Sequence, residues 1–157
     1  MKTIYLKIAL TVIVLLLGYF FIKLVYDNNP TQTAGSIELF IVDQGEIEVY
    51  HDTITYQENQ TFFDVLNENF ELTCANRNYE PDETCSYEFK TLLSYHVILG
   101  IKNEDFSILT DWSNTFIKIY VFDGTTYIES TVGVEGVDLN EIDTIKLVVK
   151  EVGVSRN

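Results

Sequence analysis

Hydrophobic and polar residues alternate through most of the chain after residue 36, the pattern of strands that have one face on a core. The alternation is clearest in three segments, and we expect a strand in each: 37–41, 116–122 and 144–152. Shorter runs predict further strands at 47–49, 71–74, 86–93 and 95–99. Residues 54 and 56 either continue the strand at 47–49 or begin another, and the pattern at 106–109 is ambiguous.

One segment, residues 61–70, has the period of a helix instead. It begins with Thr61, a residue that caps helices, and Asp64 stands where a capping box would have Glu or Gln. Its apolar residues recur at helical spacing: Phe62, Val65, Leu66 and Phe70. We therefore expect an α+β domain, mostly strands, with one short helix packed on a mixed or antiparallel sheet.

The N-terminal segment has a third pattern, because no residue from 8 to 22 is charged. A helix over residues 5–26 would be about 33 Å long, and a bilayer core is about 30 Å thick. Lys7 and Lys23 lie near its two ends, where their ammonium groups can reach the lipid headgroups. We expect residues 1–26 to form a short cytoplasmic N-terminus and a transmembrane signal anchor.

A cleaved signal peptide is the alternative interpretation, since it also combines a basic start with an apolar run. Such a peptide ends in small residues, whereas this run ends in bulky ones such as Phe20 and Phe21, so we favour the uncleaved anchor. Lys2 and Lys7 precede the run and Asp27 follows it, which places the rest of the chain outside the cell. Residues 27–36 are polar and predict a linker, and residues 37–157 predict one extracellular domain.

The net charge of that domain limits which kinds of partner it can bind. All 24 acidic residues but only seven of the ten basic residues follow Tyr26, so this part of the chain has a formal charge of −17. Such a charge repels nucleic acid, which we exclude as a partner. In the simplest interpretation, the negative charge keeps the domain soluble. Calcium binding is the alternative interpretation, but no Asp-x-Asp-x-Asp-Gly loop is present.

The two cysteines, Cys74 and Cys85, fall in the part expected outside the cell, where disulfides persist. The residues between them suit a turn, and we expect a disulfide, with two free buried thiols as the alternative. A zinc site is disfavoured because His51 and His96 have no ligand spacing to the cysteines. We expect no metal and no cofactor.

The sequence also contains no motif that identifies an enzyme. It has no nucleophile elbow, phosphate loop, zinc-protease motif or dinucleotide fingerprint. His96 lies in an apolar strand pattern, which favours a packed or edge histidine over a general base. Acidic residues are so numerous that a catalytic carboxylate pair cannot be picked out. We expect a protein that is not an enzyme.

Three segments resemble a known family, the β-grasp-like domain at the C-terminal end of transcobalamin and intrinsic factor, which also occurs on bacterial surface proteins. Residues 57–66 resemble its strand, turn and helix; residues 119–124 its Tyr-x-Val-Asn-Gly hairpin; and residues 132–145 its closing turn and last strand. The resemblance covers roughly residues 46–151. It implies a β-grasp-like fold and a binding module.

The resemblance also implies a ligand, a small flat molecule such as a corrinoid. We expect the binding edge at Trp112, Tyr120, Asp123 and Gly124. Trp112 either stacks on a ligand or simply covers the end of the core. In transcobalamin-like proteins a larger helical domain completes the corrinoid site, and this chain has no room for one, so we expect weak or no corrinoid binding.

These observations lead to two hypotheses for the function. The first is a non-catalytic binding or interaction module, anchored in the membrane and displayed at the cell surface. The second is a structural domain of a cell-envelope assembly. In both, we expect a protein partner at the cell surface.

Overall fold

The computed structural model describes residue 16, residues 33–90 and residues 94–153. The chain forms two compact units, Met1–Thr31 and Gln32–Asn157. The expected membrane anchor lies outside the described residues except for the helical Leu16, as does most of the expected linker. No helix in the described part combines the length and the apolar composition that a membrane crossing needs.

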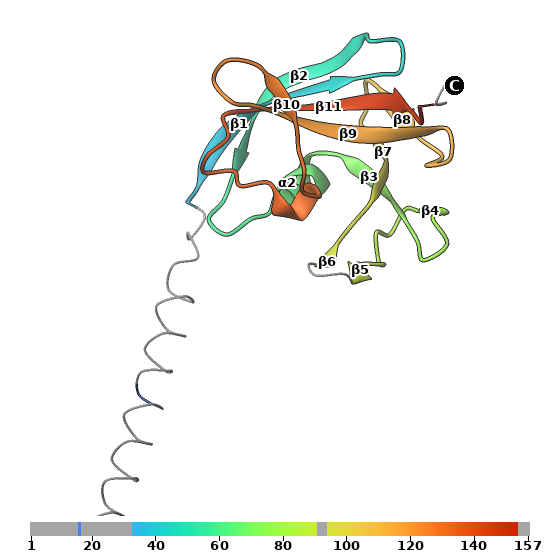
Figure 1. Ribbon diagram of the computed structural model, residues 1–157, viewed down its shortest axis with the longest axis horizontal. Helices are drawn as coiled ribbons and strands as arrows, with labels where there is room; N and C mark the ends of the chain where they lie inside the picture. The colour runs from blue at the N-terminus through green and yellow to red at the C-terminus, as the bar shows by residue number, and fades with distance from the viewer. Residues whose placement is uncertain (1–15, 17–32, 91–93, 154–157) are drawn as a thin grey trace, which may run out of the picture. The chain divides into compact units, whose positions relative to one another are not determined.

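The second unit is built mainly from strands (Figure 1). Its larger sheet has five strands in the order β10-β9-β11-β1-β2. Their bounds are Tyr127–Glu129, Thr115–Phe122, Thr144–Glu151, Gly35–Val42 and Glu48–Tyr56. β1 and β11 pair in parallel, with Leu39 opposite Ile145, and the other neighbours are antiparallel.

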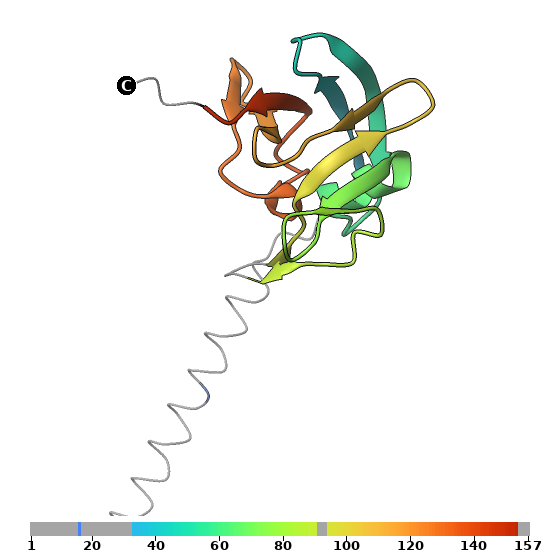
Figure 2. The ribbon, with the colours of Figure 1, turned by 90° about the vertical axis from the view of Figure 1, so that its right-hand side faces the viewer.

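A second sheet has four antiparallel strands in the order β4-β3-β7-β8. Their bounds are Pro81–Asp82, Glu71–Ala75, Ile98–Lys102 and Ser107–Leu109. A short arm made of β5, Phe89–Lys90, and β6, Ser94–Tyr95, precedes β7. Figures 1 and 2 show that β3 and β7 run past the larger sheet on the side of the helix α2.

The helix α2, Phe62–Asn69, begins where the sequence predicts. The backbone N–H of Asp64 donates to the Thr61 hydroxyl at 3.2 Å, and the Asp64 carboxylate accepts from the Thr61 N–H at 2.8 Å, so the capping box is confirmed. Its buried residues Phe62, Val65 and Leu66 face the core with β1, β2 and β11. A short 3₁₀ helix η1, Val134–Gly136, packs beside it.

The expected fold class is wrong. We expected an α+β, β-grasp-like domain preceded by a transmembrane helix, and the structure shows a sheet-rich domain with two separate main sheets and one short helix. The physical reason is that eight residues of helix cannot cover a five-stranded sheet. Leu72 of β3 and Ile101 of β7 complete the cover from the second sheet.

Two predicted strands are also corrected. Of the strand expected at 86–93, the described part contains only Phe89–Lys90, and residues 91–93 lie outside the described residues. The strand expected at 95–99 is interrupted after Tyr95 and resumes at Ile98. The interruption falls at His96, whose backbone N–H donates to the Glu135 carboxylate instead of to a strand.

Candidate binding cleft

A row of aromatic side chains runs from the β5–β6 arm to β9 of the larger sheet; we call it the aromatic row. Tyr79 stacks on Trp112, with ring centroids 5.6 Å apart and planes 17° from parallel. Tyr79 also contacts Phe89 at 4.8 Å, and Trp112 meets Phe116 edge to face at 6.3 Å. The full row is Tyr87, Phe89, Tyr95, Tyr79, Trp112 and Phe116.

The two central members of the row are exposed and have unusual backbones. Tyr79 is 43% exposed and Trp112 40% exposed. Their φ angles are 61° and 59°, in the left-handed region that bulky residues rarely adopt. Each of them lies in a turn that a preceding side chain holds.

Asp111 holds the turn of Trp112. Its carboxylate accepts from the backbone N–H groups of Asn114 at 2.8 Å and Thr115 at 3.0 Å. Hydrogen bonds from Asn114 and Thr115 lower the pKa of the Asp111 carboxyl to about 2. The carboxylate thus sets the path of the chain just before β9 and keeps the indole at the surface.

Asn76 holds the turn of Tyr79 in the same way. Its side-chain oxygen accepts from the N–H groups of Asn78 at 2.7 Å and Glu80 at 3.1 Å. The N–H of Tyr79 donates to the carbonyl of Asn76 at 2.9 Å. Asn favours such turns because its short amide bonds to the backbone just beyond it.

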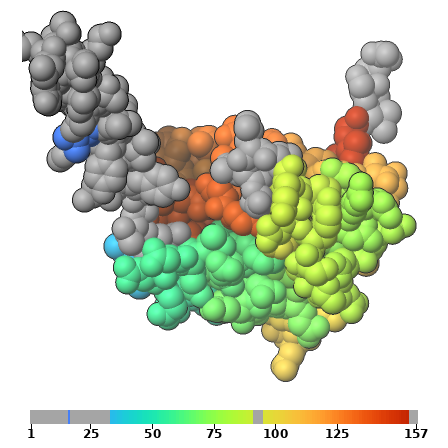
Figure 3. All heavy atoms as spheres, turned by 90° about the horizontal axis from the view of Figure 1, so that it is seen from below, coloured from blue at the N-terminus to red at the C-terminus, as the bar shows by residue number. Residues whose placement is uncertain are grey.

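The aromatic row borders a cleft of about 240 Å³. Residues 95–98 line one side and residues 116–119 of β9 line the other; residues 132–134, which lead from β10 into the start of η1, also line the cleft. Most of these side chains are apolar, and Trp112 also lines the cleft. Lys118 and Glu129 form an ion pair at 2.7 Å on its border. Figure 3 shows this side of the molecule, where β5 and β6 (yellow-green) lie beside the orange-red residues around η1.

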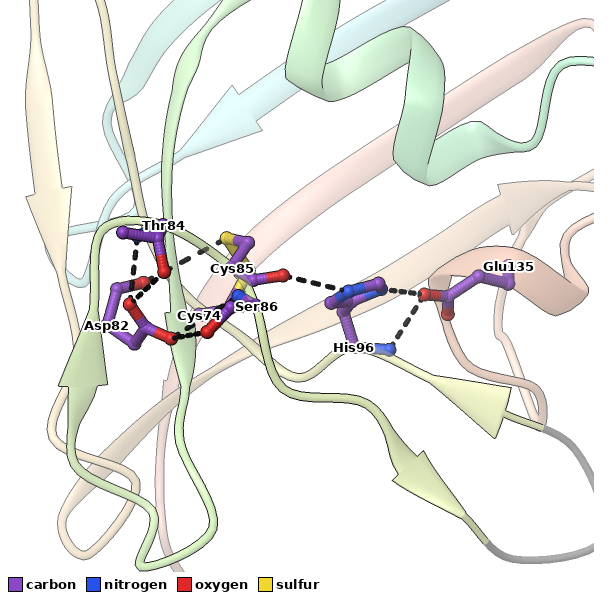
Figure 4. Close-up of a disulfide and its surroundings, with 7 residues drawn as sticks. All are labelled: Cys74, Asp82, Thr84, Cys85, Ser86, His96 and Glu135. Atoms are coloured by element: carbon purple, nitrogen blue, oxygen red, sulfur yellow. Dashed lines mark hydrogen bonds and ion pairs between the residues drawn. A yellow bond between two sulfur atoms is a disulfide. The ribbon is translucent and has the colours of Figure 1, made fainter.

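His96 lines the cleft and contacts both Glu135 of η1 and the loop of Cys85 (Figure 4). Its Nδ1 lies 2.6 Å from the Glu135 carboxylate and its Nε2 lies 3.1 Å from the Cys85 carbonyl. Both ring nitrogens face acceptors, so both contacts become hydrogen bonds when each nitrogen carries a proton. The ring also stacks on Phe63 of α2, with centroids 4.0 Å apart.

The disulfide between Cys74 and Cys85 is confirmed, with the two Cα atoms 4.9 Å apart. It joins β3 to the loop whose Cys85 carbonyl faces His96 (Figure 4). Asp82 organises the same loop by accepting hydrogen bonds from Thr84 and Ser86, which lower the pKa of its carboxyl to about 2. The loop that contacts His96 is therefore held both covalently and by polar contacts.

The structure does not bring the four predicted site residues together. Trp112 lines the cleft, whereas Tyr120 is not among its lining residues. Asp123 and Gly124 form the turn between β9 and β10, at the other end of β9 from Trp112. The Asp123 carboxylate accepts from two backbone N–H groups of that turn, and Gly124 supplies a φ of 91°. A ligand role for these three residues stays a prediction.

Tyr79 and Phe116 were not predicted as site residues from the sequence. The Asn residues before Tyr79 indicated a turn, but an aromatic in a turn has many explanations. Within the described ranges, no group of three or more His, Cys, Asp or Glu side chains could hold a metal ion.

Comparisons with protein-family models, curated proteins and solved structures find no match for this chain. The resemblance to the transcobalamin C-terminal domain therefore stays a prediction from its motifs.

Proposed function

We propose that this protein is a non-catalytic binding module that acts at the cell surface, held at the membrane by its N-terminal segment. Its binding site is the cleft together with the aromatic row. The observation that carries the proposal is the exposed Tyr79–Trp112 stack, in which both residues have left-handed backbones beside an apolar cleft. The disulfide supports an oxidising location outside the cytoplasm.

Stability alone does not explain the Tyr79–Trp112 stack. A left-handed backbone costs a non-glycine residue roughly 1–2 kcal/mol, so the two residues together cost about 2–4 kcal/mol. An aromatic pair contributes only about 0.5–1.5 kcal/mol beyond its buried area. The turns around Asn76 and Asp111 would form equally well with glycine at the strained positions. Backbone strain of this kind is concentrated at functional sites, which supports a role in binding.

The size of the cleft favours a macromolecular partner. Sites that enclose a small-molecule ligand have volumes of roughly 300–1,000 Å³, and this cleft has about 240 Å³. It can hold one or two side chains of a partner but not most of a corrinoid. We therefore propose a protein partner as the main target.

Trp112 allows a direct test, because it is the only tryptophan in the chain and lines the cleft. We would titrate the full chain with p-cresol, the side-chain analogue of tyrosine, and follow tryptophan fluorescence. We expect a saturable change at millimolar concentrations. In Val132→Arg, a charged side chain at the cleft should abolish the change. Ile128→Arg is the matched control, since Ile128 is similarly exposed but does not line the cleft.

No saturable change in the wild-type chain, or equal changes in the two variants, would contradict the proposed site. The same titration with cobalamin, corrected for its absorbance, should give weak or no binding. A submicromolar affinity for cobalamin would show that a corrinoid is the ligand.

A further inference from the structure

The cleft lies against β9 beyond the end of its pairing with β10. Four consecutive residues of β9, 116–119, line it, and their side chains alternate between the two faces of the sheet. Leu147 of β11, which pairs with Ile119, also lines the cleft, so the cleft reaches from the edge of β9 onto one face of the sheet. Residues 95–98, from the end of β6 to the start of β7, line it as well.

The edge of β9 at this point has unpaired backbone groups. β10 pairs only with Tyr120–Phe122, and beyond it the N–H of Ser130 donates to the carbonyl of Ile119 at 2.8 Å. The N–H and C=O groups of alternate residues point to the same side of an antiparallel strand. Ile117 and Thr115 therefore point theirs the same way as Ile119, away from β11. The N–H of Thr115 donates to the Asp111 carboxylate at 3.0 Å, so the groups that concern a partner are the N–H and C=O of Ile117 and the C=O of Thr115. In the described part of the chain, no strand pairs with them on this side.

We propose that an extended, positively charged segment of a partner protein adds as a strand to the edge of β9 beside Ile117 and places one side chain in the cleft. This inference rests on the proposed function and names its partner. Strand addition supplies main-chain hydrogen bonds, and an adjacent pocket takes a side chain of the added segment. Here the apolar cleft beside Trp112 takes one bulky apolar side chain.

Charge identifies the kind of partner. The part of the chain after Tyr26 has a formal charge of −17, so it attracts a cationic segment and accelerates its association. The same charge opposes edge-to-edge pairing with a second copy, since each copy has a net charge of −14. An exposed edge is a ready template for pairing, and in this chain its charge selects against self-association.

The probe for this proposal is the peptide Lys-Val-Lys-Phe-Lys-Val-Lys, added to the isotope-labelled full chain. Amide hydrogen exchange, read by NMR, should slow at least tenfold at Ile117 when the peptide saturates the site. The neighbouring amide of Lys118 is the internal control, because it faces β11 and should be slow with or without peptide. Unchanged exchange at Ile117 with peptide bound would overturn strand addition.

Two further peptides separate the components of the proposal. N-methylation of the peptide nitrogens that face β9 removes about two hydrogen bonds, each contributing about 1 kcal/mol, so binding should weaken roughly 30-fold. Replacing each Lys by Glu should abolish binding. Equal binding of the N-methylated peptide would overturn strand addition, and equal binding of the Glu peptide would overturn the charge argument.

A substitution in the protein itself, in place of a change in the peptide, also tests the edge of β9. Ile117→Pro removes the N–H that faces the cleft without removing a bond to β11, and should weaken the peptide at least tenfold; Ile117→Val is the matched control. If Ile117→Pro does not fold, binding of the N-methylated peptide to the wild-type chain tests strand addition. If p-cresol binds but no peptide does, the polypeptide partner is overturned while the binding site of the proposed function stands.

Discussion

At the scale of single residues, the carboxylate of Asp111 controls how Trp112 is presented. Its pKa of about 2 lies below the value of about 3.9 for an unfolded Asp, because the folded turn donates hydrogen bonds to the charged form. A lowered pKa contributes stability that is complete above the unfolded value and is lost as the pH falls through the folded value. The turn should therefore loosen between about pH 4 and pH 2.

We predict that the fluorescence of Trp112 changes over this acid range in the wild-type chain. In Asp111→Asn the charged group is missing, so the change should disappear or shift away from this range. Asp123→Asn is the control, because hydrogen bonds from Thr126 and Thr125 also lower the pKa of Asp123, but in a turn at the other end of β9. An acid change that persists unaltered in Asp111→Asn would show that another group governs this turn.

The His96–Glu135 contact gives a second residue-scale prediction. The side chains are only 13% and 20% exposed, and removing one partner leaves the other buried without its contact. Glu135→Ala should lower the free energy of unfolding by about 1–3 kcal/mol, measured by urea denaturation. Glu129→Ala is the matched control, since its ion pair with Lys118 is more exposed and should contribute about 0–1 kcal/mol. Equal losses in the free energy of unfolding of the two variants would contradict the prediction that the buried His96–Glu135 contact contributes more.

At the scale of elements, the start of α2 determines whether its apolar residues reach the core. Phe62, Val65 and Leu66 are fully buried, and they belong to a helix of only eight residues, which would not be stable alone. The Thr61 hydroxyl satisfies one of its free N–H groups.

We predict that Thr61→Ala lowers the free energy of unfolding by about 1 kcal/mol. Thr61→Ser keeps the oxygen and should stay close to wild type. Thermal unfolding followed by circular dichroism measures both. A loss in the Ser variant as large as in the Ala variant would indicate that the methyl group of Thr61 and not its hydroxyl stabilises the helix start.

At the scale of the whole domain, two sheets share one core, and the cleft lies between β9 of the larger sheet and residues 95–98, which lead into β7 of the second sheet. The disulfide fastens the loop before the β5–β6 arm to β3, and His96 continues this connection to η1 and α2. These links fix His96, which lines one side of the cleft, relative to β3, η1 and α2.

We predict that the double replacement Cys74→Ala and Cys85→Ala lowers the free energy of unfolding by roughly 2–3 kcal/mol, because the unfolded chain loses a closed loop. It should also weaken p-cresol binding at the cleft, since the Cys85 carbonyl no longer has a fixed position beside His96. Wild type should lose the same stability in the presence of a reductant, and the double variant should not respond to it. A wild-type chain indifferent to reductant would contradict this prediction.

Elements whose cause is local could be predicted from the amino-acid sequence. The cap at Thr61 begins a helix, the alternation at Thr144–Glu151 forms a strand, and Gly124 supplies the positive φ of the β9–β10 turn. Each depends on residues within a few positions, so a pattern along the chain reveals it. The disulfide was predicted from the location expected for both cysteines and the turn between them.

Only the tertiary structure decided the pairing of strands and the position of the site. Alternation shows that a segment is a strand but not which strand it joins, so the second sheet and the open edge of β9 were not predictable. Tyr79 and Trp112 are far apart in the sequence, and each alone resembles an ordinary surface aromatic. They become a candidate site because the two sheets bring their turns into contact, and no local pattern encodes that contact.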